Sequence, residues 1–119
     1  MSLEEQRLQE IEKILLGHRG KQKAIASNKI AQLIGIHEDD TVSTTRGLIT
    51  KLIRRTELPI GACESGYYIM QTEEELNEVM QVLNGRIHGI SDRIIHLTTN
   101  FGKYHGKSFR LLESEDDDI

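Results

Sequence analysis

Residues 40–55 (DTVSTTRGLITKLIRR) hold the side chains with the most distinctive chemistry in this sequence. On a helix, successive residues turn by about 100°, so the two sides of this stretch differ in character. Apolar residues and two threonines gather on one side: Thr41, Val42, Thr45, Leu48, Ile49, Leu52 and Ile53. The other side and its edges carry one acid, hydroxyls, a glycine and cations: Asp40, Ser43, Thr44, Arg46, Gly47, Thr50, Lys51, Arg54 and Arg55.

The polar side of this stretch has the chemistry of a polyanion-binding surface. Long cations reach phosphates or guanine edges, and Gly47 would let the helix backbone come close to a nucleic-acid groove. The alternative is the solvated face of an ordinary amphipathic helix. We therefore predict a helix over residues 40–55, with its apolar side in the core and its polar side as the candidate binding surface.

Charge is unevenly distributed along the chain. The net charge is −4, but five acids in the last seven residues carry −5, which leaves +1 for residues 1–112. Two basic segments stand out, one around the central stretch and one before it, at Arg19, Lys21, Lys23 and Lys29. Both suit a phosphate backbone. We add Lys23 and Lys29 to the candidate nucleic-acid contacts.

Length and composition set the limits of the fold. At 119 residues with 37% hydrophobic content, the chain is expected to form one domain with an appendage. It has no apolar run of membrane-spanning length and no secretion signal, so we expect a cytosolic protein. Cys63, the single cysteine, excludes an internal disulfide. No catalytic, metal-ligand or cofactor motif occurs, so we expect neither an enzyme nor a cofactor.

The rest of the first seventy residues predicts two more helices and a hairpin. Leu3 to Leu16 has an apolar stripe and is followed by Gly17 and Gly20. Residues 23–27 are expected to be extended, with Ser27 as the N-cap of a helix over residues 28–34. A polar turn at residues 37–40 follows. Two short runs flank a Glu-Ser-Gly turn, which predicts a β-hairpin with Tyr67 packed on the helices and Tyr68 exposed, or the reverse.

A long helix is predicted over residues 72–101, opened by a capping box of Thr72 and Glu75. Its apolar residues alternate steps of four and three, which is typical of a coiled-coil seam. The predicted dimer contacts are Leu76, Met80, Leu83, Ile87, Ile90, Ile94, Leu97 and Phe101. The alternative is a core helix that folds back on the domain. We expect a basic segment and a disordered acidic tail over residues 102–119.

Helix, short strand, two helices and a hairpin follow one another in the order of the winged helix-turn-helix family, which the chain resembles over residues 3–70. With LPI, GYY and TEEEL, residues 58–83 resemble small winged helix proteins of phages and prophages of Gram-positive bacteria. The resemblance implies that the third helix enters the major groove and that a wing at residues 64–66 touches the DNA backbone or minor groove. By the same resemblance, the residues expected to contact the groove are Ser43, Thr44, Arg46, Thr50, Lys51 and Arg54.

The sequence departs from that family in a long turn at residues 37–40 and a wing tip with Glu64 and no cation. We predict a mainly α protein with a small β-hairpin (α+β), divided into a winged helix domain (1–71), a dimerisation helix (72–101) and a tail (102–119). The predicted function is that of a homodimeric, double-stranded DNA-binding regulator of transcription or replication, of phage origin by resemblance and located in the host cytoplasm. The alternative is a module that binds a host protein complex, such as a phage inhibitor.

Overall fold

The computed structural model describes residues 1–36 and 41–106, with the side chains of residues 41–43 left out. The protein is mostly helical, with one small antiparallel hairpin and a long C-terminal helix, so the predicted α+β class is confirmed. The chain divides into two compact units, Met1–Val79 and Met80–Ile119. Among the described helices, none is long and apolar enough to cross a membrane.

Helix α1 (Leu3–Leu16) has the predicted bounds. Its start is capped because the Ser2 hydroxyl accepts a hydrogen bond from the Glu5 backbone N–H at 3.1 Å. Two acids in the first turn suit the positive end of the helix. Leu8, Ile11 and Leu15 are buried, so α1 places its apolar stripe in the core of the first unit.

The segment before α2 differs from the prediction. Lys21–Lys23 form a 3-10 turn (η1), and α2 spans Ser27–Leu33. The helix starts one residue earlier than predicted, so Ala26 is its N-cap and Ser27 is not; Ala26 has no side chain that can cap. Ile25 is extended as expected and exchanges two backbone hydrogen bonds of 2.8 Å with Tyr67. This bridge ties the segment to the hairpin.

The hairpin consists of β1 (Ile60–Cys63) and β2 (Gly66–Ile69), paired in antiparallel register from Ile60↔Ile69 to Cys63↔Gly66. Gly66 has a φ of 131°, and a Cβ there would lie 2.1 Å from the Ile25 carbonyl oxygen. Only glycine fits at this position, because the backbone bridge to Ile25 passes directly beside it. The predicted hairpin and its turn are therefore confirmed.

The two tyrosines face opposite sides of the hairpin, but neither is exposed. Tyr67 is half-buried and packs against the helical core. Tyr68 is buried outside that core cluster, and its ring lies within 3.1 Å of where a Cβ of Gly61 would be. Burial raises the pKa of the Tyr68 phenol, and the Glu75 carboxylate raises it further. The prediction of one exposed tyrosine was wrong because residues near the start of the last helix lie close to this second face.

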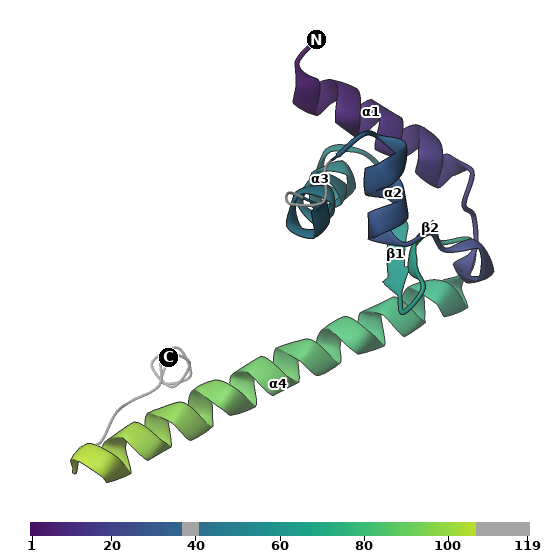
Figure 1. Cartoon of the computed structure of the whole chain (residues 1–119). Coiled ribbons are helices and arrows are strands. Elements are labelled where there is room, and N and C mark those ends of the chain that lie inside the picture. The colour runs from purple at the N-terminus through teal and green to yellow at the C-terminus, as the bar shows by residue number, and fades with distance from the viewer. Residues whose placement is uncertain (37–40, 107–119) are drawn as a thin grey trace. The chain divides into compact units, whose positions relative to one another are not determined.

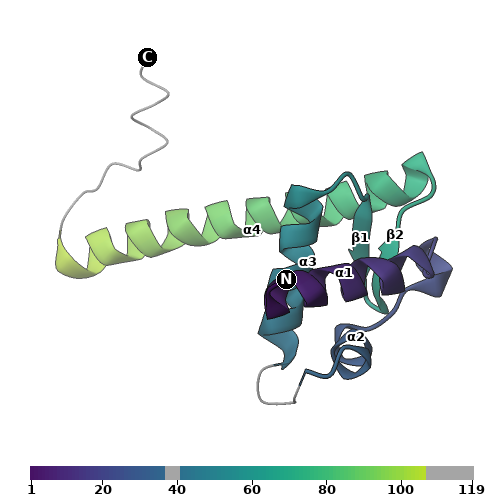
Figure 2. The same ribbon diagram turned by 90° about the horizontal axis from the view of Figure 1, so that it is seen from above.

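Helix α3 (Thr41–Arg55) packs against both α1 and α2, as Figures 1 and 2 show from two directions. Its side facing the core holds Thr45, Leu48, Ile49 and Leu52, all buried as predicted. Ile53 is 46% exposed, so its predicted place in the core was wrong. It lies 100° from Leu52, beyond the edge of the packed stripe. The described core comprises Leu8, Ile11, Leu15, Ile25, Ile30, Ala31, Ile36, Leu48, Ile49, Leu52, Ile60 and Ile69.

Helix α4 spans Glu73–His105, four residues beyond the predicted end. The helix continues through Gly102 and ends before Gly106, which has a φ of 67°. The predicted cap is present, because the Thr72 hydroxyl accepts from the Glu75 N–H at 3.2 Å. All eight apolar residues of the predicted seam are between 42% and 62% exposed. The predicted turn at residues 37–40 and the acidic tail lie outside the described residues.

Candidate nucleic-acid interface

The outward side of α3 carries three exposed residues at steps of four: Arg46, Thr50 and Arg54. Residues at this spacing form a row along one side of a helix. Gly47 lies beside the row, and no atom of the surrounding side chains would come within 4 Å of a Cβ there. The row is therefore open to a ligand while Leu48 and Leu52 hold the other side of α3 in the core.

Lys51 does not stand free on this surface. Its ammonium forms an ion pair with the Glu4 carboxylate at the start of α1, and the two side chains are 44% and 43% exposed. The hydrogen bond and charge of Lys51 lower the pKa of Glu4. Part of the predicted positive charge of α3 is thus neutralised within the first unit. The sequence carried no signal of this pairing, because the two residues are far apart along the chain.

The remaining candidates on α3 divide between the outer row and its edges. Arg55 is exposed and Thr44 is half-buried. Ser43 belongs to α3, but its side chain lies outside the described residues. Ile53, next to Arg54, has an exposed apolar side chain, whereas the sequence predicts it on the core side of the helix. The outer side of α3 is therefore more mixed in character than the sequence predicted.

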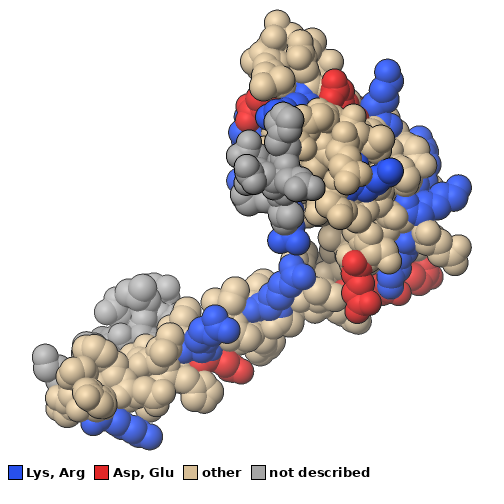
Figure 3. Space-filling view, viewed as in Figure 1, with Lys and Arg blue, Asp and Glu red and all other residues tan. Residues whose placement is uncertain are grey.

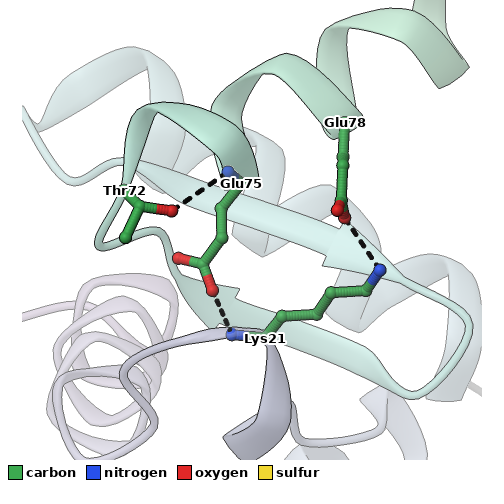
Figure 4. Close-up of polar contacts among 4 residues, drawn as sticks. All are labelled: Lys21, Thr72, Glu75 and Glu78. Carbon is green, nitrogen blue, oxygen red and sulfur yellow. Dashed lines mark hydrogen bonds and ion pairs between the residues drawn. The ribbon is translucent and has the colours of Figure 1, made fainter.

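Two of the four cations in the second basic segment, Arg19 and Lys21, make structural contacts. Lys21 is held to the start of α4: its ammonium lies 2.8 Å from a Glu78 carboxylate oxygen, and its backbone N–H donates to Glu75 at 2.7 Å (Figure 4). The Glu78 carboxylate raises the pKa of Lys21. Arg19 donates from Nε to the Leu16 carbonyl at 3.0 Å. These cations are therefore committed to partners within the first unit.

Lys23 and Lys29, the two candidate contacts from this segment, are both exposed. Lys23 ends the η1 turn, and Lys29 lies in the first turn of α2. Neither has a hydrogen bond or ion pair from its ammonium within the described part of the chain. They remain available to a ligand, whereas Lys21 does not.

The hairpin tip offers little positive charge. Glu64 and Ser65 form its turn and are exposed, and Cys63 beside them is half-buried. On the face of the first unit in view, Figure 3 shows Lys and Arg side chains in several separate places, with further ones at intervals along α4.

Within the described ranges, no group of three His, Cys, Asp or Glu side chains could hold a metal ion.

Comparisons with protein-family models, with curated proteins and with solved structures found no match for this chain. A functional assignment therefore depends on the order of the elements and on the side chains that α3 exposes. Arg46, Thr50 and Arg54 lie exposed along one side of α3, and the opposite side of this helix is buried in the core. This row is the candidate site.

Proposed function

We propose that this protein is a winged helix-turn-helix protein that binds double-stranded DNA as a homodimer and regulates transcription or replication. The order α1, α2, α3, β1, β2 supports this proposal, since α3 then corresponds to the recognition helix and the hairpin to the wing. The bridge between Ile25 and Tyr67 adds a short third pairing to the hairpin. The resemblance to phage proteins suggests the source of such a regulator.

The observation that carries the proposal is the contrast between the two sides of α3. Leu48, Ile49 and Leu52 are buried, which fixes the orientation of the helix in the first unit. Arg46 and Arg54 therefore project from a rigid support. A helix held in this way can keep its cations in register with phosphates or base edges.

The chemistry of the outer row suits a major groove. A guanidinium can donate two hydrogen bonds to the N7 and O6 atoms of a guanine, or it can pair with a phosphate. Thr50, between the two arginines, can contact a phosphate or a thymine methyl. Gly47 adds no side chain, so α3 can approach the groove closely along this edge. Lys23, Lys29 and Arg55 would supply flanking phosphate contacts.

A second function, binding to another protein, is favoured by a different observation. Ile53 on α3 and Leu33 on α2 are 46% and 56% exposed, and Lys51 is neutralised by Glu4. A partner protein could bury these two side chains in the apolar core of an interface. The cation-free hairpin tip also suits this alternative, in which the chain inhibits a host complex.

A binding assay on duplex DNA tests the proposal. Fluorescence anisotropy with a labelled pool of random duplexes, repeated over a series of salt concentrations, should show affinity whose logarithm falls linearly with the logarithm of salt. Selection from the same pool would then identify the preferred sequence. Absence of duplex binding at low salt, combined with loss of a captured protein partner on Ile53→Asp but not on Arg54→Ala, would favour the protein-binding alternative.

A further inference from the structure

The apolar seam of α4 follows a heptad pattern. In coiled-coil notation, Leu76, Leu83, Ile90 and Leu97 occupy d, and Met80, Ile87, Ile94 and Phe101 occupy a. The seven residues from Leu76 to Leu97 are 42% to 62% exposed, so the described chain leaves this surface uncovered. A seam of this period fits a second helix with the same repeat, since knobs from one helix enter holes of the other.

The residue types at a and d favour two strands over three or four. Two of the a positions hold β-branched isoleucines, Ile87 and Ile94, and three of the four d positions hold leucine. Within parallel coiled coils, this combination favours two strands, because β-branched residues pack well at the a layer and leucine at the d layer. The exceptions are Ile90 at d and Met80 and Phe101 at a.

The flanks of the seam favour the parallel orientation of the two strands. Both arginines beside it, Arg86 and Arg93, lie on the g flank, whereas the e flank holds Asn84, Ser91 and Thr98. Neither flank carries an acid between residues 76 and 105. In an antiparallel pair, g faces g, so the arginines of the two helices would lie near one another. In a parallel pair, g faces e, so each arginine would meet a hydroxyl.

We propose that a second copy of this chain covers the seam as a parallel, in-register, two-stranded coiled coil. Arg86 then lies beside Ser91 of the second copy, and Arg93 lies beside Thr98 of the second copy. The proposal rests on the homodimer named above and does not depend on DNA binding. As a consequence, the two α4 helices start at the same end of the coiled coil, and each start is joined to one copy of the first unit.

Distances between paired spin labels test the orientation. Asn77 and Asn100 are exposed on α4, and each can be changed to cysteine in a Cys63→Ser background. A parallel pair should give a short separation at both sites, across helix axes about 8–10 Å apart. An antiparallel pair aligned over the seam would separate the labels by roughly 23 residues, or about 35 Å at 1.5 Å per residue.

Each outcome of this experiment is decisive. Short separations at both sites support the proposal. Long separations at both sites, with a short one when Asn77→Cys and Asn100→Cys proteins are mixed, would overturn the parallel orientation but leave the dimer. A monomer mass by light scattering would overturn the dimer itself. The duplex assay is separate, so DNA binding by a monomer would leave the α3 assignment standing.

A charge design provides a second, independent test. Ser91→Glu with Thr98→Glu would place carboxylates beside Arg86 and Arg93 of the other helix in a parallel pair. The dimer should then dissociate at a several-fold lower concentration than the parent. The matched control, Gln81→Glu with Thr99→Glu, adds the same charge on the outer side of α4. No tightening beyond that of the control would contradict the parallel arrangement.

Discussion

Helices α3 and α4 have similar amphipathic patterns, but they use them differently. The apolar side of α3 is buried by α1, α2 and the rest of the first unit, and its polar side remains outside. The apolar seam of α4 is left exposed along its length. The same kind of periodicity therefore fixes one helix within its own chain and leaves the other with a surface that a second molecule can cover. We expect substitutions on the two apolar sides to have different consequences.

The largest contrast should come from truncating one apolar residue on each helix. Leu52→Ala removes a buried side chain and should lower the free energy of unfolding of the first unit by about 2–5 kcal/mol. Ile90 is exposed within its own chain, so Ile90→Ala leaves no cavity in the core of the first unit. Urea unfolding followed on the first unit should thus change strongly for Leu52→Ala and little for Ile90→Ala. Equal losses would mean that α4 belongs to the same core.

A charge in the seam should separate the copies without unfolding either. Ile87→Asp or Ile90→Asp would bury an unpaired carboxylate in the apolar contact, so light scattering should show a monomer where the parent is a dimer. Circular dichroism should confirm that the first unit is still folded. His88→Asp, exposed on the outer side of α4, is the matched control and should remain a dimer. A dimer mass for both seam variants would refute the seam as the contact.

A substitution on α1 should increase the positive charge on the polar side of α3. Glu4→Gln removes the partner of Lys51 and leaves a free ammonium beside the outer row. If α3 binds DNA, this variant should bind duplex more tightly, and the magnitude of its salt slope should rise by up to about one phosphate contact. Glu5→Gln on the same turn of α1 is the control. An unchanged slope for Glu4→Gln would mean that Lys51 does not reach DNA.

The smallest expected effect concerns acid stability at the start of α4. Hydrogen bonds from the Gln71 N–H, and then from the Lys21 N–H, lower the pKa of Glu75 below that of an ordinary carboxyl. A lowered folded-state pKa contributes stability above the unfolded pKa of about 4.3, and this contribution is lost as the pH falls through the folded value. The free energy of unfolding should therefore fall less steeply in acid for Glu75→Gln than for the parent.

Glu74→Gln is the control for this titration, because Glu74 is exposed and has no hydrogen bond or ion pair within the described residues. This substitution removes one carboxylate from the same turn of α4 without removing a hydrogen bond, so it isolates the effect of the Glu75 contacts. If Glu75→Gln matched the parent between about pH 5 and pH 3, the contacts of Glu75 would not contribute to the stability of the first unit.

Local sequence patterns predicted most of the elements. The stripe of Leu8, Ile11 and Leu15 and the glycine after Leu16 predicted both ends of α1. The Thr72 and Glu75 pair predicted the start of α4. These features depend on residues within one or two turns of each other, so the sequence contains what determines them. Helix α2 lies one residue earlier than predicted, because it starts at Ser27 without the side-chain cap on which the prediction depended.

Contacts between distant residues could not be predicted in this way. The ion pair of Lys51 with Glu4 and the hydrogen bond from the Lys21 N–H to Glu75 depend on how the first unit packs. The exposure of Ile53 has the same origin, since helical phase alone does not say how wide the buried stripe is. For the candidate site, the sequence therefore identified the outer row of α3 but not which of its cations are free.

The most direct test of the central proposal compares Arg54→Ala with Lys13→Ala in duplex binding over a salt series. Both cations are exposed, but Arg54 lies on the outer row of α3 and Lys13 lies in the last turn of α1. Each substitution should change the free energy of unfolding by less than about 0.5 kcal/mol. If α3 binds DNA, Arg54→Ala should lower affinity by about 1–3 kcal/mol for a guanine contact, or reduce the salt slope by about one for a phosphate contact. Lys13→Ala should bind as the parent does. Equal binding by the parent and both variants at matched salt would contradict the assignment of α3 as the DNA-binding helix.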